Sequence, residues 1–157
     1  MTERQEAARD AVMTRIGQAI MLLHGGDREE ARNRFGVLWA ELGEDGDALH
    51  RCTLAHYMAD TQDDPGDELA WDLRALTAAD GLAGERAAED QDASAVRAFY
   101  PSLHLSLAAD YLKLHRPDAA RLHLDQARDT AGGLGHDGYG GGVRAAIGRL
   151  EQRMRER

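Results

Sequence analysis

The sequence predicts an all-α protein, and three observations support this fold class. Apolar residues recur every three to four positions along almost the whole chain, which is the spacing of an amphipathic helix. No stretch alternates between apolar and polar residues with the period of a strand. Glycine, proline and aspartate interrupt the pattern at positions that suit helix ends. With 157 residues, the chain is expected to form a single domain over residues 1–157.

Three helices are predicted in the first 61 residues. The first spans about residues 3–24 and ends at a Gly-Gly pair, because glycine enters the left-handed region without a steric penalty. Asp27 is the predicted N-cap of the second helix, which stops at Gly43. A third helix covers about residues 47–61. The short connections predict that these helices pack as antiparallel neighbours.

Four more helices are predicted in the rest of the chain. The fourth spans about residues 67–80, and the fifth is long and kinked near Pro101, where proline removes a backbone hydrogen bond. Pro117 suits the first turn of the sixth helix. A glycine-rich stretch precedes the last helix, at about residues 143–157. Between the fourth and fifth helices, an acidic insert of about residues 77–96 has few apolar anchors and is expected to be a loop or a weakly held helix.

Similar residues recur in the predicted helix pairs. In the third pair, Leu107, Ala108 and Tyr111 are followed by Ala120 and Leu124. This pattern resembles the tetratricopeptide repeat, a helix–turn–helix of 34 residues. The second helix of the first pair matches it at Ala31 and Phe35, and the middle pair matches at Tyr57, whereas the third pair has His104 in place of the usual tryptophan.

The resemblance covers roughly residues 10–130 and implies a specific architecture. Antiparallel helix hairpins would stack as a short solenoid of three pairs, and the last helix would cap the open end. Leu22 and Tyr57 occupy equivalent places 35 residues apart, which is one repeat. The distance from Tyr57 to Tyr111 is one repeat plus the acidic insert.

The charge distribution limits the classes of partner. The net charge is −9, and residues 60–92 contain 11 acidic and two basic side chains. This charge argues against nucleic acid or an anionic membrane as the main partner and favours a basic protein. No apolar run is long enough for a membrane span, and the first residues do not resemble a secretory signal, so a cytoplasmic protein is expected. Arginine supplies 18 of the 19 basic residues, a bias typical of GC-rich, for example actinobacterial, genomes.

Three sequence patterns have both a chemical and a structural interpretation. Cys52, His56 and Asp60 follow one another at intervals of four residues, so they could form a metal site or a Cys/His pair, but no further ligands accompany them. We interpret them as a buried thiol with polar neighbours. The glycine-rich residues 133–138 fit G-x-G-x-x-G without a preceding strand and are expected to form a loop. Residues 63–68 are expected to be a solvated turn.

These interpretations predict no active site and no cofactor. No serine or threonine occupies a nucleophile elbow, and no pair of carboxylates is isolated among apolar neighbours. The single cysteine cannot form an internal disulfide or a four-thiolate zinc site. We therefore expect a protein that is not an enzyme and holds no metal.

The resemblance implies a function in protein binding. In this family, the first helix of each pair faces a concave groove. The residues that match groove positions are Met13, Ile16, Ile20, Leu23, Arg51, Ala55, Met58, Leu105, Ala109, Leu112 and Lys113. They are mostly small and apolar, which suits a helix of a protein or peptide partner, or a second copy of this chain in a homodimer. Alternatively, the insert or the last helix covers them within the monomer.

Two functions from different classes follow. The first is a non-catalytic adaptor that binds protein through the mostly apolar groove. The alternative is a sensor or regulatory domain for a small ligand, with a cavity between helices near Trp71, Phe99 and Tyr100. An enzymatic function would depend on Cys52 and His56 alone.

Overall fold

Seven α-helices form the part of the chain that the structure, a computed structural model, describes: residues 2–83, 91–132, 134 and 138–156. The helices are α1 (Glu3–His24), α2 (Arg28–Leu42), α3 (Ala48–Ala59), α4 (Pro65–Ala83), α5 (Gln91–Lys113), α6 (Pro117–Ala131) and α7 (Gly138–Arg155). Within these residues there is no strand, so the prediction of an all-α chain is confirmed for them. No described helix combines the length and the apolar character that a bilayer span requires.

The first helices begin and end at capping residues. Thr2 and Gln5 form a capping box at the start of α1, and Asp27 accepts a hydrogen bond from the backbone N–H of Glu30 at 3.3 Å. Gly43 ends α2 with a φ of 64°, a conformation that favours glycine. Because these signals are local, the predicted boundaries of α1 and α2 agree with the structure.

Several boundaries differ from the prediction. Helix α4 begins at Pro65, so residues 65–68, predicted as part of a solvated turn, form its first turn instead. The described parts of the 77–96 insert are helical: residues 77–83 complete α4 and residues 91–96 begin α5, while residues 84–90 lie outside the described part of the chain. Helix α7 begins at Gly138, about one turn before the predicted start, although glycine is a weak helix former. The hydroxyl of Tyr139 donates a hydrogen bond to the carbonyl of Ala98 in α5, which holds this first turn in place.

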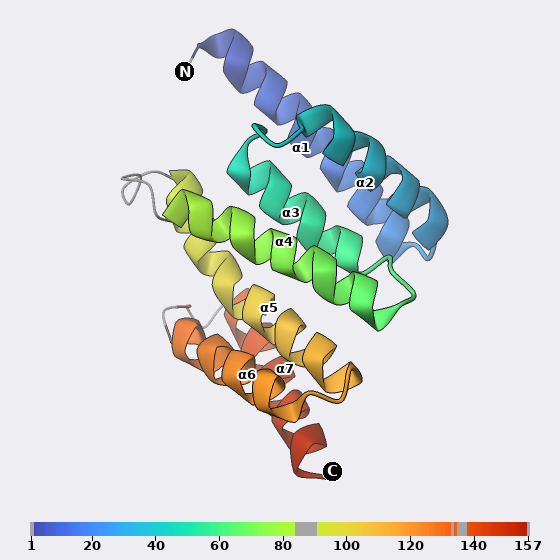
Figure 1. The fold of residues 1–157 in the computed structure, drawn as a ribbon. Coiled ribbons are helices and arrows are strands. Elements are labelled where there is room, and N and C mark those ends of the chain that lie inside the picture. The colour runs from blue at the N-terminus through green and yellow to red at the C-terminus, as the bar shows by residue number, and fades with distance from the viewer. Residues whose placement is uncertain (1, 84–90, 133, 135–137, 157) are drawn as a thin grey trace.

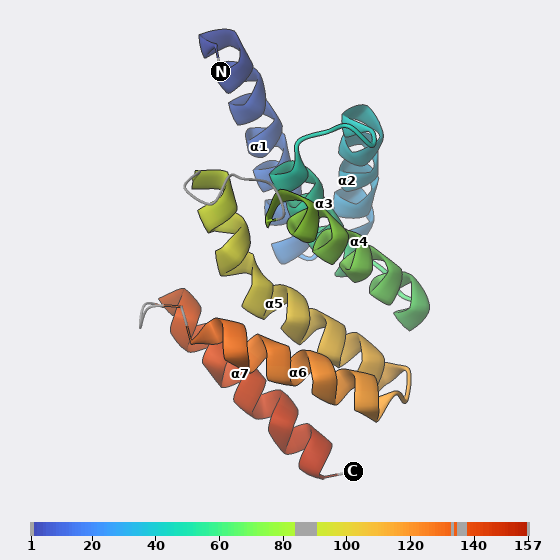
Figure 2. The ribbon, with the colours of Figure 1, turned by 60° about the vertical axis from the view of Figure 1, so that its left-hand side comes forward.

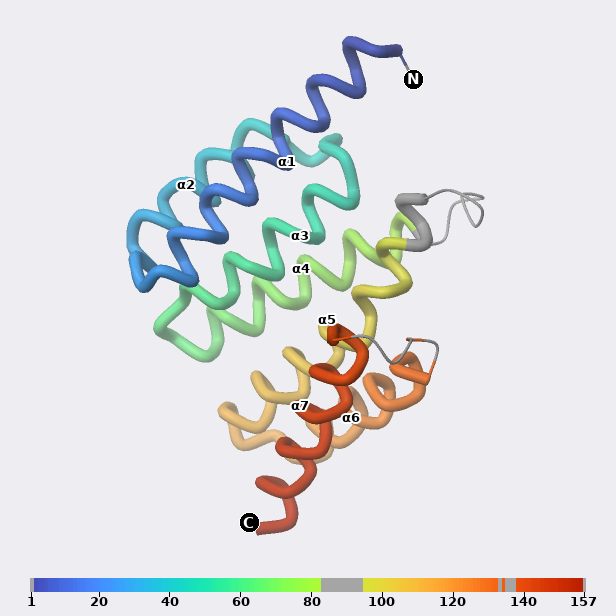
Figure 3. Tube along the Cα trace, turned by 180° about the vertical axis from the view of Figure 1, so that it is seen from behind, coloured from blue at the N-terminus to red at the C-terminus, as the bar shows by residue number. Residues whose placement is uncertain are grey.

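The helices pack in two rows. Each helix contacts the next one along the chain, and α1 contacts α3, α3 contacts α5, and α5 contacts α7. Figure 1 shows α2, α4 and α6 nearer the viewer, whereas α1, α3 and α7 come forward in the view from behind in Figure 3. The N-terminus and the C-terminus lie at opposite ends of the molecule (Figure 1). We call the side formed by α1, α3, α5 and α7 the odd-helix face.

The buried core consists of three successive clusters. Each cluster takes side chains from three consecutive helices: α1 to α3 around Phe35, α3 to α5 around Leu103, and α5 to α7 around Leu124. Helix α5 belongs to two clusters and lies between α4 on one side and α6 with α7 on the other (Figure 2). It runs through Pro101 without ending, as predicted, and changes direction along its length (Figure 2). Each helix pair therefore depends on its neighbours to bury its apolar side.

Replacing Gly148 in α7 by alanine is expected to stabilise the protein by about 1 kcal/mol, because alanine has the higher helix propensity. A Cβ atom there would meet no atom within 4 Å. Thermal unfolding should show a rise of about 2–4 °C. Gly46→Ala is the matched control: its Cβ would lie 2.8 Å from the backbone oxygen of Leu42, so this variant should unfold at a lower temperature. An unchanged or lower melting temperature for Gly148→Ala would contradict the prediction.

Candidate functional site

The predicted groove residues do not form one accessible surface. Four are buried in the core clusters, namely Ile16, Ala55, Met58 and Leu112. Five are half-buried, namely Ile20, Leu23, Arg51, Leu105 and Ala109, and two are exposed, namely Met13 and Lys113. The four buried residues contribute to packing within the chain and cannot contact a partner in this structure.

Several of the remaining groove residues have intramolecular contacts. The guanidinium of Arg51 stacks on the ring of Trp39, 4.2 Å from its centroid, and donates a hydrogen bond to the carbonyl of Gly43. Lys113 Nζ lies 2.8 Å from Glu68 Oε1. Leu105 and Ala109 pack against the core cluster that α5, α6 and α7 form together.

A cavity of about 350 Å³ opens on the odd-helix face between α3, α5 and α7. Its lining residues are His56, Tyr57, Ala95, Ala98, Phe99, Ser102 and Tyr139. Of the three residues predicted to border a ligand cavity, only Phe99 lines this one. Trp71 instead packs edge-on against the ring of Trp39, and Tyr100 donates a hydrogen bond to Asp80 Oδ1 at 2.7 Å.

Two hydroxyl groups fix one wall of this cavity. The Tyr139 hydroxyl donates its proton to the Ala98 carbonyl at 3.0 Å, so the contact of 2.7 Å with Ser102 Oγ must be donated by Ser102. The phenol ring remains 47% exposed. Ser102 in α5 and Tyr139 in α7, 37 positions apart, are therefore joined by a hydrogen bond that fixes the Tyr139 ring as one wall of the cavity; we call it the pinned aromatic wall.

A buried polar group lies behind His56. Its Nδ1 atom is 3.7 Å from Asp72 Oδ1 in α4, and the carboxyl of Asp72 is within hydrogen-bond reach of the carboxyl of Asp110 in α5. Asp72 and Asp110 are only 2% and 1% exposed. His56 Nδ1, Asp72 Oδ1 and Asp110 Oδ2 have no hydrogen-bond partner. The expectation that no two carboxylates are isolated in the interior is therefore wrong.

Burial determines the protonation of the carboxyl pair. It raises the pKa of both Asp72 and Asp110, because the low-dielectric interior disfavours the charged form. The hydrogen bond between them lowers the pKa of Asp72 and raises that of Asp110 further. Asp110 is therefore the carboxyl that keeps its proton, whereas the pKa of Asp72 is raised to about 7, so Asp72 is ionised in only about half of the molecules at neutral pH. Together the two carboxyls carry at most one negative charge near neutral pH, and they reach it only at higher pH.

Burial also keeps His56 neutral. It lowers the pKa of the imidazole, while the nearby carboxyls of Asp60 and Asp110 raise it in part. When Asp72 is ionised, its carboxylate 3.7 Å from Nδ1 favours the tautomer that carries its proton on Nδ1. In that tautomer the other ring nitrogen, Nε2, can accept a hydrogen bond, and His56 is among the residues that line the cavity.

The row of Cys52, His56 and Asp60 is not a ligand set. Cys52 is completely buried, and burial raises the pKa of its thiol to about 12, so it stays protonated. Asp60 is exposed at the end of α3. Among the described residues, no three histidine, cysteine, aspartate or glutamate side chains could hold a metal ion together. Of the G-x-G-x-x-G stretch at residues 133–138, the structure describes only Leu134 and Gly138, so the prediction of a loop there lies largely outside the described residues.

Comparison of the chain with protein-family models, with curated proteins and with solved structures found no match. A function must therefore be inferred from the structure itself. We base it on the cavity of the odd-helix face, because aromatic rings, a hydroxyl and the imidazole of His56 meet there. The sequence pointed to Phe99 in this region but not to the contacts among His56, Ser102 and Tyr139, which depend on how α3, α5 and α7 are placed.

Proposed function

We propose that this chain is a non-catalytic helical-repeat module, similar to tetratricopeptide repeats, that binds a segment of another protein on its odd-helix face. The observation that carries the proposal is the order of the helix contacts. Alternate helices touch in sequence, from α1 to α3, α3 to α5 and α5 to α7, while the second helix of each pair lies on the other side. Stacked hairpins with this order of contacts present one continuous face for recognition.

The character of the cavity supports a protein partner. Its walls include the rings of Tyr57, Phe99 and Tyr139. Aromatic side chains of this kind are enriched at protein interfaces, because they supply a large contact area at a low entropic cost. A volume of about 350 Å³ accommodates a large side chain of a bound segment.

Two observations favour a non-catalytic role. The Cys52 thiol is buried and protonated, which makes it a poor nucleophile. The hydroxyl of Ser102 donates its proton to Tyr139 rather than to a base. An activated serine requires a base as the acceptor of its hydrogen bond.

Filling the cavity tests this function. Ala98 is exposed and lines the cavity, so Ala98→Trp would occupy it without removing a hydrogen-bonding side chain. We expect this variant to lose most of the partner captured by the parent chain in affinity purification with mass spectrometry. Ala40→Trp, at an exposed position of α2, is the matched control and should retain the partner. Equal capture by both variants would contradict the proposal.

A second candidate function is the sensing of a small ligand, and the position of Phe99 in the cavity wall favours it. A ligand that binds only the folded state stabilises it by about 2.7 kcal/mol at a hundredfold excess over its dissociation constant. A screen by thermal shift would reveal such a compound. The shift must disappear in Ala98→Trp if the compound occupies this cavity.

A further inference from the structure

The inner surface of the cavity offers aromatic faces and a hydrogen-bond acceptor, and two of its three hydroxyl protons are already donated within the chain. Tyr57, Phe99 and Tyr139 supply the rings. The Tyr139 hydroxyl already donates its proton to Ala98, and Ser102 donates to Tyr139. With Nδ1 of His56 directed at Asp72, the remaining ring nitrogen accepts a hydrogen bond. A group that fits these walls must stack on rings and donate hydrogen bonds.

The charges around the cavity are predominantly negative. The carboxylate of Asp60 interacts electrostatically with both His56 and Tyr57, and Lys113, a cation that acts on it, pairs directly with Glu68. The Asp72–Asp110 pair adds part of a negative charge near neutral pH, since the pKa of Asp72 is raised to about 7. Glu68 is balanced by Lys113, at 2.8 Å. A cationic group that enters the cavity is therefore stabilised by electrostatic attraction, whereas a carboxylate or phosphate would be repelled.

From these features, and on the basis of the function proposed above, we infer that the cavity receives the guanidinium group of an arginine side chain from the partner protein. Guanidinium is planar, stacks on aromatic faces and carries five N–H donors. A lysine ammonium is more strongly hydrated and does not stack as a plane, so it fits less well. The chain already uses this contact twice on itself: Arg51 lies 4.2 Å from the ring centroid of Trp39, and Arg74 lies 4.4 Å from that of Trp71.

Two small probes of equal size separate the contribution of charge from that of shape. Nα-acetyl-arginine methylamide carries the guanidinium, and the corresponding citrulline compound replaces it by a neutral urea. In NMR titrations of the full chain, the arginine probe should shift the ring signals of Tyr57, Phe99 and Tyr139 and bind about fivefold more tightly than the citrulline probe. The glutamate analogue should not shift these signals.

Variants assign the binding to the proposed groups. Asp60→Asn should weaken the arginine probe by about threefold and leave the citrulline probe unchanged. Asp129→Asn removes the same formal charge from an exposed position of α6 and should have no effect. Ala98→Trp should abolish binding of both probes. Equal affinity for the two probes, or no signal shift with arginine at about 10 mM, would overturn the inference.

The outcome also separates this inference from the proposed function. If Ala98→Trp removes partner capture but the arginine probe does not bind, the partner docks through another kind of side chain and only this inference fails. If Ala98→Trp leaves capture intact, the proposed function fails whatever the probe does.

Discussion

Replacing Asp110 by asparagine is expected to stabilise the chain by about 2 kcal/mol at pH 8 and to have little effect near pH 4.5. Asparagine preserves the shape of the side chain, and its amide donates a hydrogen bond to Asp72 in place of the carboxyl proton of Asp110. The substitution therefore keeps the contact while removing a carboxyl that must hold its proton against the solvent.

The direction of the effect follows from proton linkage. Burial raises the pKa of Asp110 far above its value of about 3.9 in the unfolded chain. Above that pH the folded state binds a proton that the unfolded state has released, so wild-type stability falls as the pH rises, by up to about 1.4 kcal/mol per unit. The full stability of the pair exists only below the unfolded pKa. Asp110→Asn lacks this carboxyl, so its free energy of unfolding does not fall through the deprotonation of residue 110 as the pH rises.

Thermal unfolding between pH 4.5 and 8 measures the difference. At pH 8, Asp110→Asn should melt about 4–8 °C above the wild type, and the gap should close toward pH 4.5. His56 and Asp72 are present in both proteins, but Asp110 shifts the pKa of each, so their titrations also contribute to the pH dependence of the gap. Asp129→Asn is the control, because this exposed aspartate in α6 should give no such pH-dependent gap. A gap that stays constant with pH would show that Asp110 is not buried as a proton-bearing acid.

The fold could be predicted where its determinants are local. Asp27, Gly43 and Pro117 mark helix ends through their own backbone chemistry, and each lies at or beside a helix boundary in the structure. His104, which stands in the place of the tryptophan of the repeat pattern, is buried, with 8% of its surface exposed. The start of α7 could not be predicted, because Tyr139 is held by Ala98, 41 residues earlier in the chain.

The candidate site was harder to predict because α3 is covered on most of its circumference. Residues 52–55 are all buried, since α3 contacts α1, α2, α4 and α5. A helix of this kind has no single apolar stripe, so sequence periodicity could not separate groove positions such as Ala55 from core positions. The burial of Asp72 could have been predicted, because Asp72 lies on the same helical stripe as the apolar residues Leu69 and Leu76. Its partner, Asp110, depends on the register between α4 and α5.

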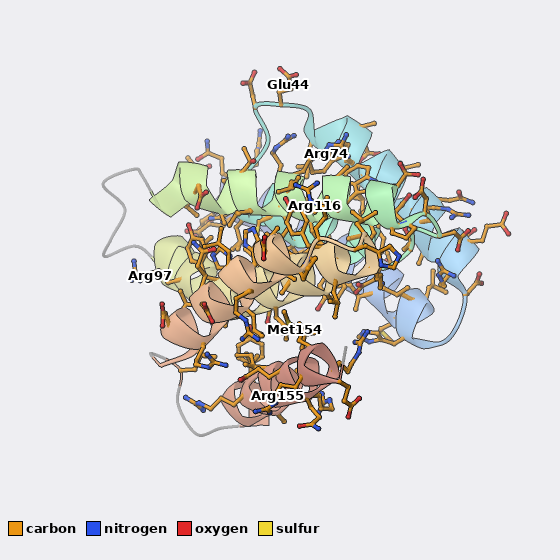
Figure 4. The ribbon with its side chains drawn as sticks, turned by 60° about the horizontal axis from the view of Figure 1, so that its bottom comes forward. Glu44, Arg74, Arg97, Arg116, Met154 and Arg155 are labelled. Atoms are coloured by element: carbon orange, nitrogen blue, oxygen red, sulfur yellow. The ribbon has the colours of Figure 1, made fainter. Side chains whose placement is uncertain are left out.

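Replacing Ile147 by aspartate is expected to release α7 from the rest of the chain. Ile147 is 4% exposed in the cluster that α7 forms with α5 and α6, and Met154, further along α7, is directed toward these two helices (Figure 4). An unpaired carboxylate in this interior costs about 3–5 kcal/mol. Without Ile147, docking of α7 buries only Val143 and Leu150 fully, worth about 1.5–3 kcal/mol each, and the cost of burying the charge cancels this gain.

Hydrogen exchange measured by mass spectrometry locates the change. Since α7 contacts no helix but α5 and α6 in the described part of the chain, exchange should accelerate about 100-fold in α7, while α1 and α2 remain protected. Leu122→Asp introduces the same charge at a position that is 58% exposed in α6 and should leave exchange unchanged. A uniform increase across all seven helices would instead show that the chain unfolds as one cooperative unit. Because Tyr139 belongs to α7, the released helix should also take one wall of the cavity with it, and Ile147→Asp should lose the arginine probe without any change to His56 or Asp60.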